Sequence, residues 1–348
     1  MEEIVNQIAD LCGLRDRYAL DDAMVRLVYL SGKGAITVVR VLREVGDLGD
    51  MHCLTRAEFD AKKMSPTRVP AWKDWRELPA LADFPARLQA HTQGSTVQVQ
   101  GALGAPCLTV LLVGEVRPVL TLLELESDKP LTEPLLRGVE GLMRVYSNLE
   151  NLLDYGEKDS LTGLLNRKTF DGAFLKAAVE MNTPNDLEPA DRRSAHTQDG
   201  YWLAVMDIDH FKRVNDDFGH LIGDEVLLLM ARLMRTSFRF YDQLYRFGGE
   251  EFVILMRCAS PDDAAGAVER FRARVQEHLF PQVGHITVSV GYAALRDNDT
   301  PGSAFDRADK AVYYAKAHGR NQVVSYQSLV ASGELAEEVE TEQEIDFF

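Results

Sequence analysis

The sequence predicts a two-domain protein of the mixed α/β (α+β) class. Its 348 residues suffice for two domains of ordinary size, each with a core of its own. A helical pattern near 134–155 separates two regions in which strand-like and helical segments follow one another. We expect an N-terminal α+β domain at 1–130, a helical coiled-coil-type linker at 131–157, an α/β domain at 158–328 and an acidic, disordered tail at 329–348.

The N-terminal region reads as a helix, several strands and a closing helix. Apolar residues at helical spacing, beginning with Ile4 and Ile8, predict one helix over about the first 25 residues. Strands are expected at 36–42, 97–99, 108–112 and 119–125. Residues 50–95 are rich in Pro, Trp and charge, and we expect short helices there at most. The order resembles a GAF sensory domain, with a PAS domain as the alternative, and the signal or partner it senses cannot be read from the residues.

The linker carries an apolar stripe that alternates steps of four and three residues. This is the a/d spacing of a heptad seam, and it predicts parallel packing of two chains in a dimer. Three heptads are short for an independent coiled coil, so a helix packed on its own domain is the alternative. The stripe consists of Leu135, Val139, Leu142, Tyr146, Leu149 and Leu153.

The C-terminal region alternates helices and strands in the manner of an α/β domain. A polar segment with prolines, 182–200, reads as an exposed loop. A Gly-Gly turn joins two strand-like runs into a hairpin at 243–256. The other strands are expected at 201–206, 286–294 and 321–326, and the helices at 166–179, 224–237, 261–279 and 303–317.

Charge and composition exclude several classes of protein. The net charge is −16, and the last 15 residues hold seven acids and no base. Such a surface repels nucleic acid, whereas a few local cations can still hold an anionic ligand. Apolar runs are too short for membrane insertion, and the acidic N-terminus is unlike a secretory signal. Four dispersed cysteines argue against disulfides and a zinc site, so we expect a cytoplasmic protein.

Carboxylates gather at two places in the C-terminal domain. Asp207 ends a buried strand and Asp209 follows it, while Glu250 and Glu251 follow the Gly-Gly turn. If these elements are sheet neighbours, the acids converge, which is costly unless a cation lies between them. Hard oxygen ligands favour Mg²⁺ or Mn²⁺ and a phosphate substrate. A solvated, Glu-rich turn is the alternative.

Four motifs surround these acids. They read DSLTGLLNR (159–167), DIDHFK (207–212), RFGGEEF (246–252) and YAK with GRN (314–321). Together they resemble the GGDEF domain of the diguanylate cyclase family, in its GGEEF form, over about 156–328. The resemblance implies a palm-like fold with a central, partly antiparallel sheet flanked by helices.

This resemblance implies an enzyme that condenses two GTP molecules into cyclic di-GMP and releases two pyrophosphates. Each domain binds one GTP, and two domains face each other in a homodimer, which gives the heptad helix a purpose. The N-terminal domain would then regulate the output. The rival interpretations are a silent receptor for cyclic di-GMP and a cyclase with a monocyclic product. The complete acid set favours the enzyme.

The resemblance also assigns metal and catalytic roles. Asp207, Glu250 and the carbonyl of Ile208 match ligands of Mg²⁺ (or Mn²⁺). Glu251 either helps the 3′-hydroxyl lose its proton or holds a second metal, so the roles of Glu250 and Glu251 stay unseparated. Lys212 joins these two glutamates in the catalytic set.

Substrate residues follow from the same motifs. Asn215 and Asp224 match the guanine-reading pair, and a carboxylate can accept from N1–H and the 2-amino group that only guanine offers. The phosphate contacts match Lys212, Lys316 and Arg320. The remaining substrate-binding candidates are Phe211 and His220, of which the histidine lies by the base or packs in the loop.

A product site is expected near the hairpin. Arg239 stands nine residues before Gly248, and the segment 239–242 has the R-x-x-D form of the family's inhibitory site. Arg239 and Asp242 would hold a guanine of cyclic di-GMP, with Arg270 as a second arginine. The resemblance therefore implies feedback inhibition by the product.

Overall fold

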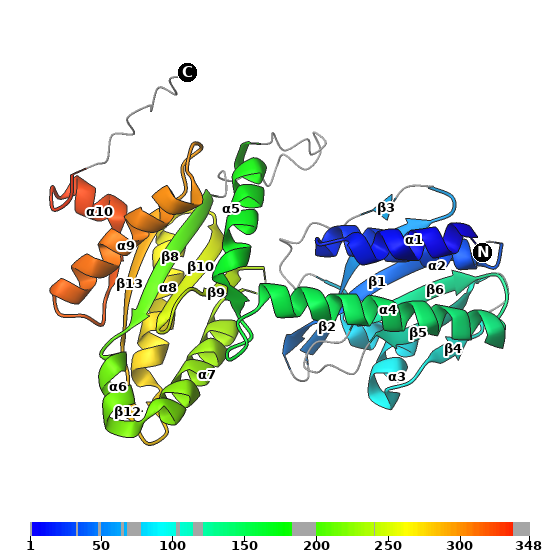
Figure 1. The fold of residues 1–348 in the computed structure, drawn as a ribbon, viewed down its shortest axis with the longest axis horizontal. Helices are drawn as coiled ribbons and strands as arrows, with labels where there is room; N and C mark the ends of the chain where they lie inside the picture. The colour runs from blue at the N-terminus through cyan, green and yellow to red at the C-terminus, as the bar shows by residue number, and fades with distance from the viewer. Residues whose placement is uncertain are drawn as a thin grey trace. The chain divides into compact units, whose positions relative to one another are not determined.

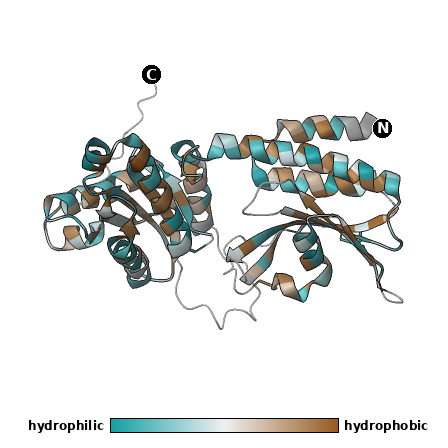
Figure 2. Cartoon of the chain, turned by 90° about the horizontal axis from the view of Figure 1, so that it is seen from below, coloured by the Kyte–Doolittle hydropathy of each residue, from teal (hydrophilic) through white to brown (hydrophobic). Residues whose placement is uncertain are grey.

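The computed structural model describes residues 2–32, 34–47, 50–63, 66–67, 78–101, 105–113, 121–182, 200–239 and 241–336. These residues form two compact units that divide between Gly156 and Glu157 (Figure 1). Each unit is built on a six-stranded sheet. Apolar residues follow the strands in both units, as Figure 2 shows. Within the described ranges, none of the helices has the length and apolar composition needed to cross a membrane.

The N-terminal unit is an antiparallel sheet with helices on both faces. Its strand order is β3-β2-β1-β6-β5-β4. The strands are β1 (Ile36–Asp47), β2 (Asp50–Asp60), β3 (Pro66–Thr67), β4 (Val97–Val99), β5 (Cys107–Val113) and β6 (Thr121–Ser127). The helices are α1 (Glu2–Gly13), α2 (Arg17–Ser31), the short η2 (Leu81–Asp83), α3 (Pro85–Gln93) and α4 (Glu133–Glu157).

Two apolar clusters hold this unit together, one on each face of the sheet. Val28 of α2 and Tyr146 of α4 are buried with Val39 of β1 on one face. Ala90 of α3 is buried with Leu42 of β1 on the other face. Because side chains alternate between the two faces along β1, this strand contributes residues to both cores.

The structure corrects two sequence predictions here. The single helix expected at the N-terminus is two helices, because Asp16 accepts a hydrogen bond from the amide of Ala19 (3.0 Å) and caps α2. The prediction for 50–95 is wrong at its start, since β2 is a strand of 11 residues. The charged residues of β2 made the segment look like exposed surface in the sequence. In the structure, the guanidinium of Arg56 is buried and pairs with Asp21 at 2.6 Å.

The heptad stripe of α4 is covered within its own unit. Val139, Leu142 and Tyr146 are buried in the core beneath α4. Leu135, Leu149 and Leu153 are partly buried and pack against the same core. The structure thus shows the alternative arrangement for these positions, and the dimer stays a prediction.

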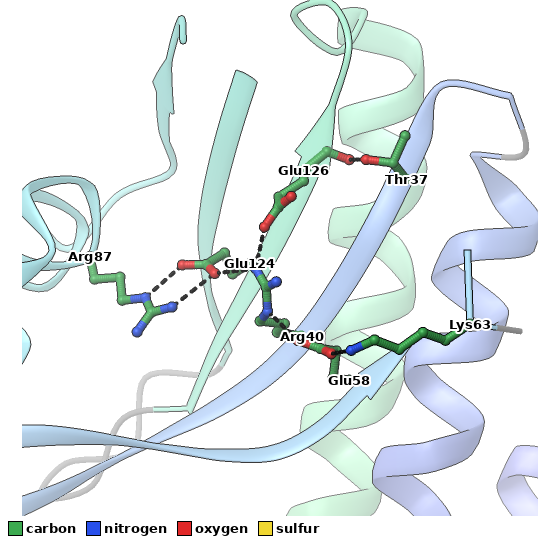
Figure 3. A network of polar contacts seen from close by, with 7 residues as sticks. All are labelled: Thr37, Arg40, Glu58, Lys63, Arg87, Glu124 and Glu126. Atoms are coloured by element: carbon green, nitrogen blue, oxygen red, sulfur yellow. Dashed lines mark hydrogen bonds and ion pairs between the residues drawn. The ribbon is translucent and has the colours of Figure 1, made fainter. Parts of the chain in front are cut away.

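Charged residues also penetrate the sheet face beneath α3 (Figure 3). Glu124 of β6 is 2% exposed and accepts hydrogen bonds from Arg87 of α3 at 2.6 and 2.9 Å. Arg40 of β1 reaches Glu124 at 3.0 Å and Glu58 of β2 at 2.7 Å. A buried carboxylate needs such partners, so these pairs tie α3 to the sheet.

The C-terminal unit places an antiparallel centre between parallel edges. Its strand order is β14-β13-β8-β10-β9-β7, with β8 antiparallel to both of its neighbours. The strands of this sheet are β7 (Leu165–Asn166), β8 (Gly200–Ile208), β9 (Gln243–Arg246), β10 (Glu251–Cys258), β13 (Val288–Ala294) and β14 (Val323–Ser325), beside the two-stranded β11 (Leu279–Phe280) and β12 (Gly284–His285). The helices are α5 (Arg167–Asn182), α6 (Phe211–Phe218), α7 (His220–Ser237), α8 (Pro261–Glu277), α9 (Pro301–Ala317) and α10 (Tyr326–Ala331).

Helices cover both faces of this sheet. Met230 of α7 and Phe271 of α8 are buried with Met206 of β8 on one face. Phe174 of α5 and Ala311 of α9 belong to the cluster on the other face. Gly291 of β13 permits the close approach of α9, because a Cβ there would lie 2.2 Å from a backbone oxygen of that helix. This approach places the end of α9 beside the end of β8.

The predicted elements of this unit recur with shifted ends. The helix expected at 224–237 begins at His220, and the short helix α6 precedes it. The strand expected at 321–326 covers Val323–Ser325, and α10 follows it into the segment predicted as tail. Residues 183–199 and 337–348, where the loop and the rest of the tail were expected, lie outside the described residues.

Candidate active site

The acids at the strand ends meet at one edge of the C-terminal sheet. Strand pairing sets Glu251 of β10 directly opposite Asp207 of β8. Glu250 precedes β10, and its carbonyl accepts from the amide of Ile208 at 3.4 Å. The hairpin turn and the strand end are thus neighbours, as the motif spacing predicts. The structure brings Asp207, Glu250 and Glu251 together.

The electrostatics of this edge reflect crowded carboxylates. Burial raises the pKa of Asp207, and the Lys316 ammonium, 2.7 Å from Oδ2, opposes that rise. Burial also raises the pKa of Glu250, and the charge of Asp207 adds to the effect. The ionised forms of Asp207 and Glu250 are therefore electrostatically unfavourable, and a cation in addition to Lys316 would stabilise them.

Asp209, two residues after Asp207, has a structural role. Asp209 is 5% exposed and accepts from the hydroxyls of Thr287 and Ser289, each at 2.7 Å. The amide of Asn321 donates to the same carboxylate at 3.0 Å. With its lone pairs engaged in this way, Asp209 fixes the loop after β8 instead of facing a ligand.

Helix α6 starts directly after these acids. His210 precedes it with φ of 60°, a left-handed conformation that a non-glycine residue adopts at some cost. The first amides of a helix lack intrahelical acceptors, so those of Phe211 and Lys212 suit a phosphate. The Phe211 side chain is buried in the core, so only the backbone amide of Phe211 could contact a ligand. The Lys212 side chain is exposed.

The predicted guanine-reading pair spans the joint between α6 and α7. Asn215 lies on α6, and its Oδ1 lies 2.0 Å from where a Cβ on Gly223 would be. Asp224 follows Gly223 and is exposed. The two helices therefore touch where Asn215 packs on Gly223, one position before Asp224. His220 is exposed in the first turn of α7.

The end of α9 completes the cationic side of the edge. Lys316 lies in the last turn of α9, and Arg320 follows Gly319 with a φ of 60°. The hydrogen bond from the amide of Asn321 to Asp209 ties this loop to the end of β8. The ion pair of Lys316 with Asp207 and this hydrogen bond thus hold the end of α9 and the following loop at the same edge as the acids.

Comparison with known proteins decides the family of this unit. The model of the family described as "Diguanylate cyclase, GGDEF domain" matches residues 157–322. The C-terminal unit contains a GGDEF domain. Its six-stranded sheet has an antiparallel centre and helices on both faces, as the sequence predicts.

Named relatives are similar to about half of the chain. The chain is 41% identical to the diguanylate cyclase DgcP of Pseudomonas aeruginosa over 181 residues, which are 51% of this chain and 25% of that protein. It is 37% identical to the response regulator PleD of Caulobacter vibrioides over 184 residues, 51% of this chain and 38% of that protein. It thus spans well under half of either relative. A crystal structure of the GGDEF domain of DgcB from Caulobacter crescentus with c-di-GMP is 32% identical, with a TM-score of 0.42, covering 49% of this chain and 96% of that chain.

The acids of the GGDEF domain fit a divalent metal by their chemistry. Among the described residues, no group of three or more His, Cys, Asp or Glu side chains is arranged to hold an ion. The carboxylates of Asp207 and Glu250 and the carbonyl of Ile208 would supply oxygen ligands only, which suits Mg²⁺ when water and phosphate complete the shell. Burial raises the pKa of both acids, and a bound cation would favour their ionised forms.

The predicted product site of the GGDEF domain is only partly assembled. Oδ2 of Asp242 accepts from the backbone amide of Arg239 at 2.8 Å, and the Arg239 guanidinium donates to the hydroxyl of Tyr241 at 2.7 Å. Burial raises the pKa of Asp242 to about 6. Arg270 is exposed on α8 and, among the contacts of the described residues, does not join the other two.

The sequence-based predictions assign no role to Asp309 of α9. It is exposed, and its negative charge contributes to the raised pKa of Asp207, after the larger effect of burial. It precedes Lys316 by seven residues, which is about two helical turns and hence one face of α9. This spacing is the sequence feature from which the place of Asp309 near Lys316 could have been predicted.

Proposed function

We propose that this protein is a diguanylate cyclase that condenses two GTP molecules into cyclic di-GMP and two pyrophosphates. The observation that carries the proposal is the pairing of Glu251 with Asp207 at the sheet edge, with Glu250 beside them. Three acids at one strand end, next to helix amides and lysines, suit phosphoryl chemistry better than any other use.

In this proposal the chain's own groups bind and orient the nucleotide. Asp207, Glu250 and the carbonyl of Ile208 hold Mg²⁺, which neutralises charge on the phosphates when bound. The Lys316 ammonium, 2.7 Å from Asp207, would be placed to donate to a phosphate oxygen held at this edge. The amides at the start of α6 and the exposed Lys212 and Arg320 add further donors.

The attacking group needs a proton acceptor. Glu251 lies opposite Asp207 and is half-buried at the start of β10. We assign it the proton of the ribose 3′-hydroxyl of the nucleotide bound in its own domain. That oxygen then attacks the α-phosphorus of the GTP held by the facing domain, and pyrophosphate leaves. A homodimer is therefore part of this proposal.

The base pocket supports GTP as the substrate. Asp224 can accept from N1–H and the 2-amino group of guanine, and Asn215 packs on Gly223, the residue before Asp224. Adenine would leave the Asp224 carboxylate without these donors, which is the kind of mismatch that gives strong discrimination.

The decisive experiment is an assay of the full chain with GTP and Mg²⁺, with separation of cyclic di-GMP, linear dinucleotide and pyrophosphate. Asp207→Asn and Glu251→Gln should each lower the rate by at least about 100-fold. Glu225→Gln, an exposed acid on α7, is the matched control. Normal turnover of Asp207→Asn would refute the site, and binding of cyclic di-GMP with no turnover would make the protein a receptor.

Product inhibition through Arg239, Asp242 and Arg270 belongs to the same proposal. It is supported by the R-x-x-D sequence and by the exposure of Arg239 and Arg270. Because Arg239 is bonded to Tyr241, ligand binding requires that contact to open. Arg239→Ala should keep the initial rate and abolish inhibition by added cyclic di-GMP. Inhibition that stays unchanged would rule this site out.

The N-terminal unit is proposed to be a GAF-like sensor that regulates the cyclase. The support is its element order: helices, an antiparallel sheet and a closing helix that leads into the GGDEF domain. Removing residues 1–130 should change the rate or its dependence on chain concentration. An unchanged rate would show that this unit has no regulatory part.

A further inference from the structure

A second cationic cavity lies across the hairpin from the acids. It is open to solvent and has a volume of about 380 Å³. Its basic residues are Arg167, Lys168 and Arg246, and its acid is Asp159. The glycines of the hairpin turn and Asn166 and Phe247 complete the lining. In a chain of net charge −16, this cavity carries an excess of two positive charges.

The cations differ in how they are engaged. Arg246 pairs with Asp159 at 3.0 Å and donates to the carbonyl of Gly249 at 2.9 Å, so it is fixed. Arg167 and Lys168 are exposed, and within the described part of the chain no acid pairs with either of them. The guanidinium of Arg167 instead lies 5.6 Å from the ring centre of Phe247.

Their position works against folding. Arg167 and Lys168 are the first two residues of α5, and no acid occupies its first turn. Cations at the positive end of a helix dipole are unfavourable. Residues that are unfavourable for folding often occur where a binding site requires them. An anion in the cavity would pair with both Arg167 and Lys168.

The cavity lies on the β9 side of the hairpin, whereas the acids and phosphate contacts proposed for the domain's own nucleotide lie on its β8 side. Its residues lie at β9 and at β7, where Asn166 pairs with Arg246. Asp207 lies on β8, so β10 stands between the two sites and about 10 Å separates β8 from β9. The Mg²⁺ and phosphate contacts proposed above are on the far side of the hairpin.

We infer that this cavity holds phosphate of the GTP that the facing subunit presents. The inference rests on the proposed function, in which the two nucleotides meet across the hairpins. Arg167 and Lys168 would then stabilise charge at the α-phosphorus that the domain's own 3′-hydroxyl attacks. The ligand class is the phosphate chain of a purine nucleoside triphosphate bound by a second copy of this chain.

Single variants separate catalysis from nucleotide binding. In the full chain, Arg167→Ala should lower kcat by about 100-fold. The affinity of each domain for a non-hydrolysable GTP analogue should stay within twofold of the original, because its own phosphates are held elsewhere. The melting temperature should not fall, since an unfavourable charge is removed. Lys176→Ala on the same helix is the control for lost positive charge. An unchanged kcat, or weaker analogue binding, would overturn the inference.

Mixed dimers test whether the cavity acts on the other subunit. One chain carries Asp207→Ala and its partner carries Arg167→Ala, each with its own purification tag. The nucleotide of the Arg167→Ala chain then keeps its metal acids and faces an intact cavity, so one bond forms and linear pppGpG accumulates. If Arg167 acted on its own nucleotide, both halves would be damaged and no linear product would form.

The reciprocal mixture must give the opposite result. Here both substitutions are on one chain and the partner is unsubstituted. The intact chain's nucleotide faces a damaged cavity, and linear product should be absent. Its appearance would overturn the inference. If the unsubstituted dimer makes no cyclic di-GMP, then the proposed function itself fails, and the two failures are distinguishable.

Discussion

Gly223→Ala should weaken GTP binding without unfolding the GGDEF domain. A Cβ at this position would lie 2.0 Å from Oδ1 of Asn215 and 3.4 Å from the ring of Phe211. The ring distance is near ordinary contact, whereas the oxygen must move. Because Oδ1 ends a flexible side chain, Asn215 can rotate away, and its amide then leaves the position in which it is proposed to contact the base.

The magnitude follows from one lost hydrogen bond. A guanine donor or acceptor left without its partner costs about 1 to 1.5 kcal/mol, which is about tenfold in the dissociation constant. Against this, alanine is favoured over glycine inside a helix by about 1 kcal/mol. The free energy of unfolding should therefore stay level or rise slightly while affinity falls.

Calorimetric titration with a non-hydrolysable GTP analogue measures the affinity, and thermal unfolding measures the stability. Gly172→Ala on α5 is the matched control, since a Cβ there would meet nothing within 4 Å. It should show the stability gain with unchanged affinity. Adding Asn215→Ala to Gly223→Ala should cause no further loss. Full GTP affinity of Gly223→Ala would refute the assignment of Asn215 to the base.

Three further outcomes are expected. Arg87→Met leaves the buried Glu124 short of a partner and should destabilise the N-terminal unit by about 3 kcal/mol, measured by urea unfolding, whereas Arg137→Met in an exposed pair should cost under about 0.5 kcal/mol. Asp242 binds its proton more tightly when folded, with a pKa raised from 3.8 to about 6. The free energy of unfolding should therefore fall as pH rises from about 4 to 6, by at most about 3 kcal/mol, and Asp242→Asn should flatten that slope. Because burial raises the pKa of Asp207, protons compete with metal, so thermal stabilisation by Mg²⁺ should shrink as pH falls; a gain at low pH would contradict the metal site.

The centre of the C-terminal unit could be predicted because its signals are local. The apolar run before Asp207, the Gly-Gly turn and the acids after it specify two neighbouring strands within about 50 residues. Once those strands pair, the register alone brings Glu251 to Asp207. Short elements such as α6 and α10 were missed, since eight and six residues hold too little periodicity to stand out.

The N-terminal unit could not be predicted as well because its signals depend on distant partners. Strand β2 places Arg56 under the helices, where Asp21 on α2 neutralises it. Only the fold shows that pairing, and without it a charged run reads as surface. The stripe of α4 poses the same problem, since an apolar face does not say what covers it, and here its own sheet does.

Asp209 has a practical consequence for anyone who shortens this protein. Its carboxylate gathers the start of β13 and the chain at Asn321 onto the loop that follows Asp207. A truncation before Asn321 would remove β14 and also one of these donors, and so would loosen the loop between β8 and α6. The shortest stable GGDEF domain of this chain thus depends on a backbone amide more than 100 positions downstream of Asp209, and its C-terminal limit should be sought beyond residue 321.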